Sequence, residues 1–241
     1  MMSDRPVVLI HGGWHGGWHW DDVVARLAPT TRVFAPTLTG LAERAAEATP
    51  QTTLDTHVQD VVRVVEEHDL HDVVLVAHSY GGMVAAGAST VLGDSVTDVV
   101  YLDAFVPEDG QSVADLLGPE FSAGARAAAA ANDVPYLLPP LFSVEDILGW
   151  TGPRAEELAA RMCPHPLGTL DSPVRVSDQR ARRTFIYCNA RPLGLVERHA
   201  EHARTSPDWD YLELPSPHDA VHYMPAAVAG IVRSFAEGVG R

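Results

Sequence analysis

Short runs of β-branched and aliphatic residues alternate along the chain with longer stretches that have helical spacing of their apolar positions. The short runs are bounded by turn residues and predict strands at Val7–Ile10, Val33–Pro36, Val73–Ala77, Val99–Leu102, Thr184–Cys188 and Tyr211–Leu214. The longer stretches predict helices at Trp20–Leu27, Leu54–His68, Met83–Leu92 and Pro225–Glu237. This alternation predicts an α/β fold with a mostly parallel sheet and helices on both faces.

The regular alternation stops between Val106 and Arg183. We expect residues 106–183 to form an inserted helical cap on a core made of residues 1–105 and 184–241. The insertion contains an alanine-rich stretch, an apolar proline-containing segment "PYLLPPLF" and a short helix, at Ala123–Ala131, Pro135–Phe142 and near Arg154–Met162. Long insertions of this kind are usually functional lids, and the alternative is a packing subdomain that never touches substrate.

Composition and charge narrow the class of protein. The 241 residues are 46 % hydrophobic and 20 % charged, which suits one globular domain with an insertion. The net charge of −15 has the wrong sign for a nucleic-acid binder. No apolar run approaches the roughly 18 residues that a membrane span needs, so we expect no membrane partner. We expect a small-molecule substrate as the partner, and a homodimer stays open.

The two cysteines, Cys163 and Cys188, cannot form a disulfide framework, and neither belongs to a CxxC pair. The first strand-like run begins near Val7, which leaves no room for a signal peptide ahead of it. We therefore expect a protein of the reducing cytoplasm.

The segment "VVLVAHSYGGMVA" (residues 73–85) places a serine between a predicted buried strand and a predicted helix. A small residue two positions after Ser79 permits a sharp turn that projects the hydroxyl from the end of the sheet. The usual pattern of this elbow is G-x-S-x-G, and Ala77 occupies its first position here. The backbone N–H of Tyr80 would face the negative charge that develops on a substrate. A helix N-cap is the alternative, but it does not explain the flanking glycines, so we interpret Ser79 as a nucleophile.

A second oxyanion donor is expected from the loop after the first strand, "HGGWHGGWHW" (residues 11–20). Gly13 is our choice for this backbone N–H, with Trp14 next, because glycine lets the backbone approach the serine closely. A phosphate cradle is the alternative, but GxGxxG is absent. His11, His15 and His19 are spaced by four, but we expect no carboxylate or cysteine to join them, and therefore no metal and no organic cofactor.

The general base is expected last in the chain, on the loop after the final strand. "YLELPSPHDAVHYMP" puts His218 on that loop and His222 nearer the following helix, so His218 is favoured. No carboxylate follows the strand Thr184–Cys188 before Glu197, which lies in a predicted helix. Asp103, at the end of the strand next to the one that carries Ser79, is therefore the predicted acid; capping the connection into the lid is its alternative role.

Together these stretches resemble the α/β-hydrolase superfamily, and within it the branch of small esterases and hydroxynitrile lyases that includes plant methyl-salicylate esterases and bacterial relatives. The resemblance covers nearly the whole chain and rests on "VLIHGGWHGGWHW", "LVAHSYGG", "VVYLDAFVPEDGQS", "CPHPL" and "SPHDAV". It implies the α/β-hydrolase fold, with Ser79 as nucleophile, His218 as base, and the N–H groups of Gly13 and Tyr80 as the oxyanion hole.

Two departures from the family's pattern bear on the activity. The late-strand aspartate of the plant members is absent, but Asp103 matches the position where haloalkane dehalogenases of a related branch carry a catalytic carboxylate. Hydroxynitrile lyases that resemble this chain carry a lysine directly after the catalytic histidine and a threonine in the first loop. Asp219 and Gly12 stand at those positions here, which favours an esterase over a lyase.

The sequence thus predicts a serine carboxylesterase that forms an acyl-enzyme on Ser79. Its pocket is expected to have aromatic and aliphatic walls, which suits a small aromatic or alicyclic ester; the expected lining residues are Trp14, Phe105, Leu137, Leu138, Phe142 and Trp150. A C–C bond lyase or a natural-product tailoring enzyme that uses His218 as base, and a non-catalytic small-molecule receptor, are the alternatives.

Overall fold

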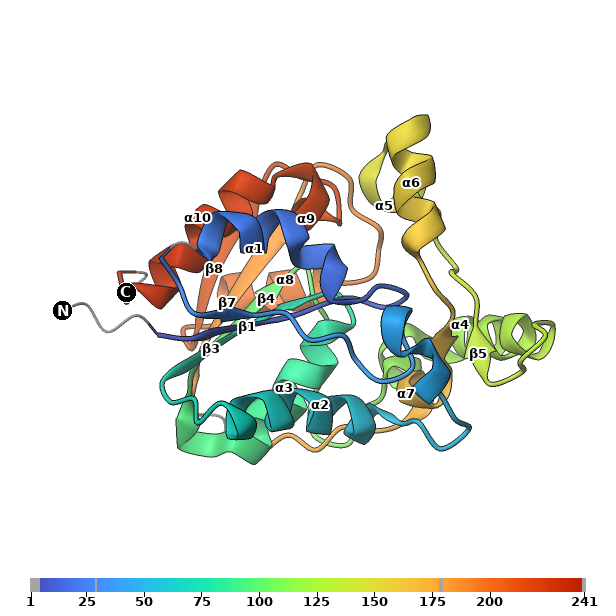
Figure 1. The fold of residues 1–241 in the computed structure, drawn as a ribbon, viewed down its shortest axis with the longest axis horizontal. Coiled ribbons are helices and arrows are strands. Elements are labelled where there is room, and N and C mark those ends of the chain that lie inside the picture. Colours follow the sequence, from blue (N-terminus) through green and yellow to red (C-terminus); the bar gives the residue numbers. More distant parts are fainter. Residues whose placement is uncertain (1–4, 29, 178–179, 240–241) are drawn as a thin grey trace.

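The computed structural model describes residues 5–28, 30–177 and 180–239, and it has a six-stranded parallel sheet at its centre (Figure 1). The strand order is β2-β1-β3-β4-β7-β8. The strands are β1 (Val7–Ile10), β2 (Val33–Phe34), β3 (Val73–His78), β4 (Val96–Leu102), β7 (Arg182–Cys188) and β8 (Trp209–Leu214). All six match the predicted strands to within three residues at each end. β3 is buried along its whole length, as expected for a central parallel strand.

Helices cover both faces of the sheet, and each face has its own apolar core. Buried residues of α2 (Leu54–Glu67), α3 (Gly81–Leu92) and α8 (Glu197–Thr205) belong to one core. Those of α1 (Asp21–Leu27), α9 (Ala220–Tyr223) and α10 (Pro225–Ala236) belong to the other. A 3₁₀ helix, η1 (Gly17–Trp20), precedes α1; two more, η2 (Ala42–Glu47) and η3 (Gly93–Ser95), lie in connections. No helix in the described ranges has the length and apolar character of a membrane span.

The insertion after β4 gathers at one end of the sheet, beyond the carboxyl ends of the strands (Figure 1). It contains α4 (Val113–Ala130), α5 (Val144–Leu148), α6 (Pro153–Arg161) and α7 (Gly168–Asp171). It is not wholly helical, because β5 (Leu137–Leu138) pairs in antiparallel fashion with β6 (His165–Pro166). These two-residue strands lack the alternating pattern from which a strand can be recognised. The second half of α4, which bends at Gly118, covers the alanine-rich stretch up to Ala130.

The turn between β3 and α3 is closely packed against neighbouring backbone. A Cβ atom added to Gly82 would lie 2.1 Å from the carbonyl oxygen of Phe105, and one added to Gly81 would lie 2.7 Å from that of Ile10. Both contacts are far below van der Waals distance and involve backbone, which cannot move aside cheaply. The two glycines therefore allow α3 to start directly after the end of β3. This close packing fixes the position of Ser79 at the end of the sheet.

We expect Gly82→Ala to lower the free energy of unfolding by on the order of 1–3 kcal/mol, the usual cost of overpacking. Gly230→Ala in α10 is the matched control, because no atom lies within 4 Å of its added Cβ. That substitution should stabilise the protein by about 0.5–1 kcal/mol through helix propensity. Urea denaturation of both variants measures the difference, and equal stabilities would contradict the packing argument.

Candidate active site

Three predicted residues from distant parts of the chain meet at the carboxyl edge of the sheet. Ser79 follows β3, Asp103 follows β4, and His218 lies on the loop between β8 and α9. The His218 Nδ1 atom is 2.6 Å from Asp103 Oδ2, and its Nε2 atom is 3.0 Å from Ser79 Oγ. With Nδ1–H donating to the carboxylate, Nε2 is free to accept the serine proton. The structure thus brings together a hydroxyl, an imidazole and a carboxylate in the order that nucleophilic catalysis requires.

The neighbouring side chains show why the other candidate residues do not join this group. His222 Nδ1 lies 2.8 Å from Asp219 Oδ2 rather than near the serine. The carboxylate of Glu197 accepts hydrogen bonds from the backbone N–H groups of Gly194 and Val196 at the start of its own helix. The second carboxylate oxygen of Asp103 is also occupied, by the backbone N–H of Cys188 at the end of β7 at 3.0 Å.

Both proposed oxyanion donors lie beside the serine. Gly13 and Tyr80 line the same cavity as Ser79, and their N–H groups meet no acceptor within the described part of the chain. An added Cβ at Gly12 would lie 3.1 Å from Ser79 Cβ, so a glycine there lets the first loop approach the serine. An oxygen bound between these two N–H groups would be stabilised as it gained negative charge.

The cavity at Ser79 is mainly apolar and lies between the core and the insertion. Of the predicted lining residues, Trp14, Phe105 and Phe142 do line it. The prediction is wrong for Leu137, Leu138 and Trp150. Most lining residues that were not predicted come from α4, α5, α7 and the segment before α8. The lining residues that were not predicted are Gly12, His15, His78, Val113, Leu117, Phe121, Ile147, Met162, His165, Leu170, Leu193 and Leu195.

The three misassigned residues are held elsewhere by specific contacts. Leu137 and Leu138 form β5 and pair with β6. The Trp150 ring packs against Tyr223, and the Arg154 guanidinium lies 4.5 Å above it. Apolar character alone could not distinguish residues that wall the cavity from residues that hold the insertion together. Met162 directly precedes "CPHPL" (residues 163–167) and His165 lies within it, so this stretch was the one sequence signal for that part of the cavity wall.

Trp14 connects the first loop to the insertion by hydrogen bonds from three of its atoms. Its indole Nε1–H donates to the carbonyl of Leu138 at 3.1 Å, and its carbonyl accepts from the backbone N–H of Cys163 at 3.0 Å. Its backbone N–H approaches His165 Nδ1 at 3.4 Å. Trp14 has a left-handed backbone with φ of 64°. These contacts hold the residue next to Gly13 in a conformation that few non-glycine residues adopt.

A set of buried histidines surrounds the site, and burial keeps them neutral. Burial lowers the pKa of His11 to about 3 and that of His57 to about 4. It also lowers the pKa of His15, His78 and His165 well below the ordinary value. Neutral imidazoles can accept as well as donate hydrogen bonds, which suits a site that must not hold several positive charges.

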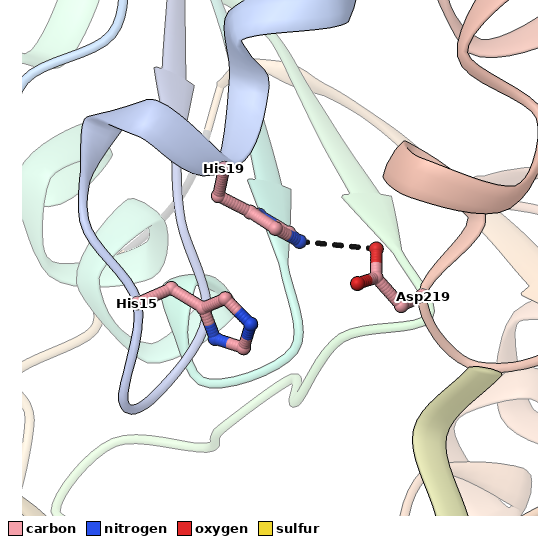
Figure 2. A group of neighbouring side chains, drawn as sticks. All are labelled: His15, His19 and Asp219. Carbon is pink, nitrogen blue, oxygen red and sulfur yellow. Dashed lines mark hydrogen bonds and ion pairs between the residues drawn. The ribbon is translucent and has the colours of Figure 1, made fainter. Parts of the chain in front are cut away.

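Among the described residues, His15, His19 and Asp219 are the group whose ligand atoms could converge on a metal ion, since these atoms all lie within 4.8 Å of one another. The expectation that no carboxylate joins the loop histidines is thus wrong: Asp219 reaches them from the far end of the chain (Figure 2). Figure 2 shows His19 pointing at Asp219, and the Nε2–Oδ1 distance is 3.0 Å. In this arrangement the His19 imidazole and the Asp219 carboxylate are hydrogen-bonded to each other.

The buried histidines predict a loss of stability in acid. His57 has a pKa near 4 in the folded protein and an ordinary value of 6.5 when unfolded. The unfolded chain therefore binds more protons between these values, and stability falls as the pH drops from about 6.5 toward 4. For His57 the loss approaches roughly 3 kcal/mol. Urea denaturation across this pH range measures it.

His57→Gln, which can keep the donor toward the Thr39 carbonyl, should give a shallower pH dependence than the wild type. His71→Gln is the control, because the His71 side chain is exposed. If both variants kept the wild-type slope, the buried histidine would not be the cause of the acid sensitivity.

Comparisons with known proteins show the family to which this chain belongs. Residues 7–231 match the model of the alpha/beta hydrolase family. A carbendazim hydrolyzing esterase from Nocardioides sp. (strain SG-4G) is 34 % identical over 92 % of this chain and 96 % of its own. Lipase LipV of Mycobacterium tuberculosis is 28 % identical over 95 % and 92 %. The solved structure of an extracellular alpha/beta-hydrolase from a Paenibacillus species superposes with a TM-score of 0.80 at 24 % identity, over 95 % and 97 %.

Proposed function

Because the chain belongs to the alpha/beta hydrolase family and is an esterase, we propose that it cleaves small carboxylic esters through an acyl-enzyme on Ser79. The observation that carries the proposal is the hydrogen-bonded series from Ser79 Oγ through His218 to Asp103. No other role of the serine, such as capping α3, requires this alignment. A non-catalytic receptor would have no need for it either.

In the proposed mechanism, Ser79 Oγ attacks the ester carbonyl while His218 Nε2 takes its proton. Asp103 keeps the Nδ1–H tautomer in place and stabilises the imidazolium that forms. The N–H groups of Gly13 and Tyr80 hold the oxyanion of the tetrahedral intermediate. His218 then protonates the departing alcohol, and a water molecule activated by the same imidazole hydrolyses the acyl-enzyme to release the acid.

The shape of the cavity suggests what kind of ester is accepted. Its walls are aromatic and aliphatic, with Trp14, Phe105, Phe121 and Phe142 among them. No arginine lines it within the described part of the chain, so a charged acyl group finds no partner there. We therefore propose that the substrates are neutral esters with a small aromatic or alicyclic part. Carbendazim is a suitable compound to test, because a relative is named for hydrolysing it.

The first test is turnover of p-nitrophenyl acetate by the wild type and three variants. Ser79→Ala and His218→Ala should each lose at least about 10³-fold in kcat, because the nucleophile and the base act as one unit. Asp103→Asn should lose about 10³–10⁴-fold, since an amide can hold the imidazole in the wrong tautomer. Circular dichroism of each variant checks that the fold is intact.

A fluorophosphonate probe gives a second readout that does not depend on the ester chosen. It should label the wild type and leave Ser79→Ala unlabelled. Labelling that persisted in Ser79→Ala would contradict the nucleophile assignment. Turnover that survived in Ser79→Ala would instead favour chemistry in which His218 acts as a base without an acyl-enzyme.

A further inference from the structure

His165, a residue of the insertion, lies against both residues proposed as oxyanion donors. It opens β6, its side chain is fully buried, and it lines the cavity at Ser79. A Cβ atom added to Gly13 would lie 3.8 Å from His165 Nδ1 and 3.9 Å from Tyr80 Cβ. The His165 and Tyr80 rings are 4.8 Å apart between centroids and meet edge to face. The three residues therefore pack together at one part of the cavity wall.

The hydrogen bonds of the His165 ring fix which of its nitrogen atoms carries the proton. The Thr169 hydroxyl donates to the Pro166 carbonyl at 2.8 Å, and its Oγ1 lies 2.7 Å from His165 Nε2. Since the hydroxyl proton is used at the carbonyl, Thr169 Oγ1 accepts from Nε2–H. Because burial keeps the ring neutral, Nδ1 is left with a lone pair that can only accept.

The lone pair on His165 Nδ1 faces the peptide group that joins Gly13 to Trp14. The Trp14 N–H donates to Nδ1 in a long hydrogen bond of 3.4 Å. The carbonyl of the same peptide, that of Gly13, accepts from His15 Nδ1 at 2.6 Å. This peptide group is thus held at both ends, by one histidine of the first loop and one of the insertion. Its orientation determines how the preceding N–H, the proposed donor of Gly13, points into the cavity.

The side chain of Tyr80 is held on the other side of the His165 ring. His57 Nε2 donates to the Thr39 carbonyl at 2.8 Å, so His57 Nδ1 accepts from the Tyr80 hydroxyl at 2.9 Å. The phenol is therefore anchored to α2 at one end while the His165 ring packs against it. Fixing this side chain also fixes the backbone N–H of Tyr80 relative to that of Gly13.

The first hypothesis for a buried histidine is that it only holds the insertion together. The pairing of β6 with β5 is made by the backbone, and the bond to Thr169 uses Nε2 alone. Neither requires an acceptor at Nδ1, on the side of the ring that faces Gly13 and Trp14. That acceptor indicates a role at the oxyanion donors.

We propose that His165 is a positioning residue of the oxyanion hole: its Nδ1 holds the Gly13–Trp14 peptide and its ring holds Tyr80, so that both N–H groups face one substrate oxygen. The proposal rests on the function proposed above. It gives the insertion a part in stabilising the oxyanion, in addition to walling the cavity.

Two substitutions separate the two nitrogen atoms of the His165 ring. His165→Asn places an amide oxygen near the position of Nδ1 and keeps an acceptor for the Trp14 N–H. His165→Gln places an amide nitrogen near the position of Nε2 and keeps only the donor to Thr169. Both variants lose the ring, so the difference between them isolates the acceptor. We expect kcat on p-nitrophenyl acetate to be about tenfold lower in His165→Gln than in His165→Asn, with similar KM, because the oxyanion forms only on the way to the transition state.

A second pair of variants leaves His165 in place and changes Thr169, which is not among the residues that line the cavity. Thr169→Val removes the acceptor of the Nε2 proton, so the ring can carry its proton on Nδ1 instead and then opposes the Trp14 N–H. Thr169→Ser keeps the hydroxyl. Thr169→Val should therefore show the larger loss of kcat, and this pair decides the question if a His165 variant does not fold.

A thionoester separates a misaligned oxyanion hole from a general loss of folded enzyme. Sulfur accepts hydrogen bonds more weakly than oxygen, so aligned N–H groups favour p-nitrophenyl acetate over p-nitrophenyl thionoacetate. The ratio of kcat/KM for the two esters should be smaller in His165→Gln than in His165→Asn, and smaller in Thr169→Val than in Thr169→Ser. Loss of folded enzyme would lower both rates equally and leave this ratio unchanged.

Hydrogen exchange of the Trp14 amide, followed by NMR, tests the contact without any substrate. Exchange should be faster in His165→Gln than in His165→Asn. This difference in an enzyme that is inert toward esters would refute the esterase assignment and leave the contact between His165 and the first loop standing. Equal exchange in the two variants, or an active enzyme in which they have equal kcat and equal ester selectivity, would overturn the role of His165.

Discussion

The site depends on two sharp turns at adjacent strand ends, at Ser79 after β3 and at Asp103 after β4. Both residues have left-handed backbones, with φ of 53° and 44°. For residues other than glycine this conformation costs roughly 1–2 kcal/mol each. Cross-strand bonds offset it: Phe105 N–H donates to the Ser79 carbonyl at 3.1 Å, and Asp103 N–H donates to that of Ile186 at 2.8 Å. These bonds hold both turns at the carboxyl edge of the sheet. The Ser79 hydroxyl and the Asp103 carboxylate therefore project from the same edge, where the His218 imidazole contacts both.

The insertion also helps to hold the residues of the site in place. Its Leu138 carbonyl accepts from the Trp14 indole N–H, and its Cys163 N–H donates to the Trp14 carbonyl. Its Ile147 carbonyl accepts from the Asp219 backbone N–H. Trp14 and Asp219 follow directly after a proposed oxyanion donor, Gly13, and after the proposed base. The same elements that wall the apolar cavity therefore hold the polar groups in place. The mainly apolar walls of the cavity also strengthen the hydrogen bonds beside it, since the surroundings are of low polarity.

The parallel sheet and the position of Ser79 could be predicted from the sequence, because both depend on patterns of neighbouring residues. Buried parallel strands appear as short β-branched runs, and the elbow at Ser79 needs small residues at fixed spacing. What failed depends on tertiary contacts. Leu138 is as apolar as the residues that line the cavity, but it pairs with His165 in β5–β6 and is not among them. Asp219 is about 200 residues from His19 in sequence, and no local sequence pattern predicts the hydrogen bond between the two side chains.

The position of the acid has a structural consequence of its own. β7 lies between β4 and β8 in the sheet, so the Asp103 carboxylate passes the end of β7 on its way to His218 and accepts the Cys188 N–H there. A carboxylate on the connection after β7 would occupy that space instead. With the proposed acid directly after β4, the segment that leads from β7 to α8 carries no member of the proposed triad, and its Leu193 and Leu195 line the cavity. If Asp103 is the acid, as we propose, this stretch of chain needs no catalytic residue and can contribute apolar side chains to the cavity.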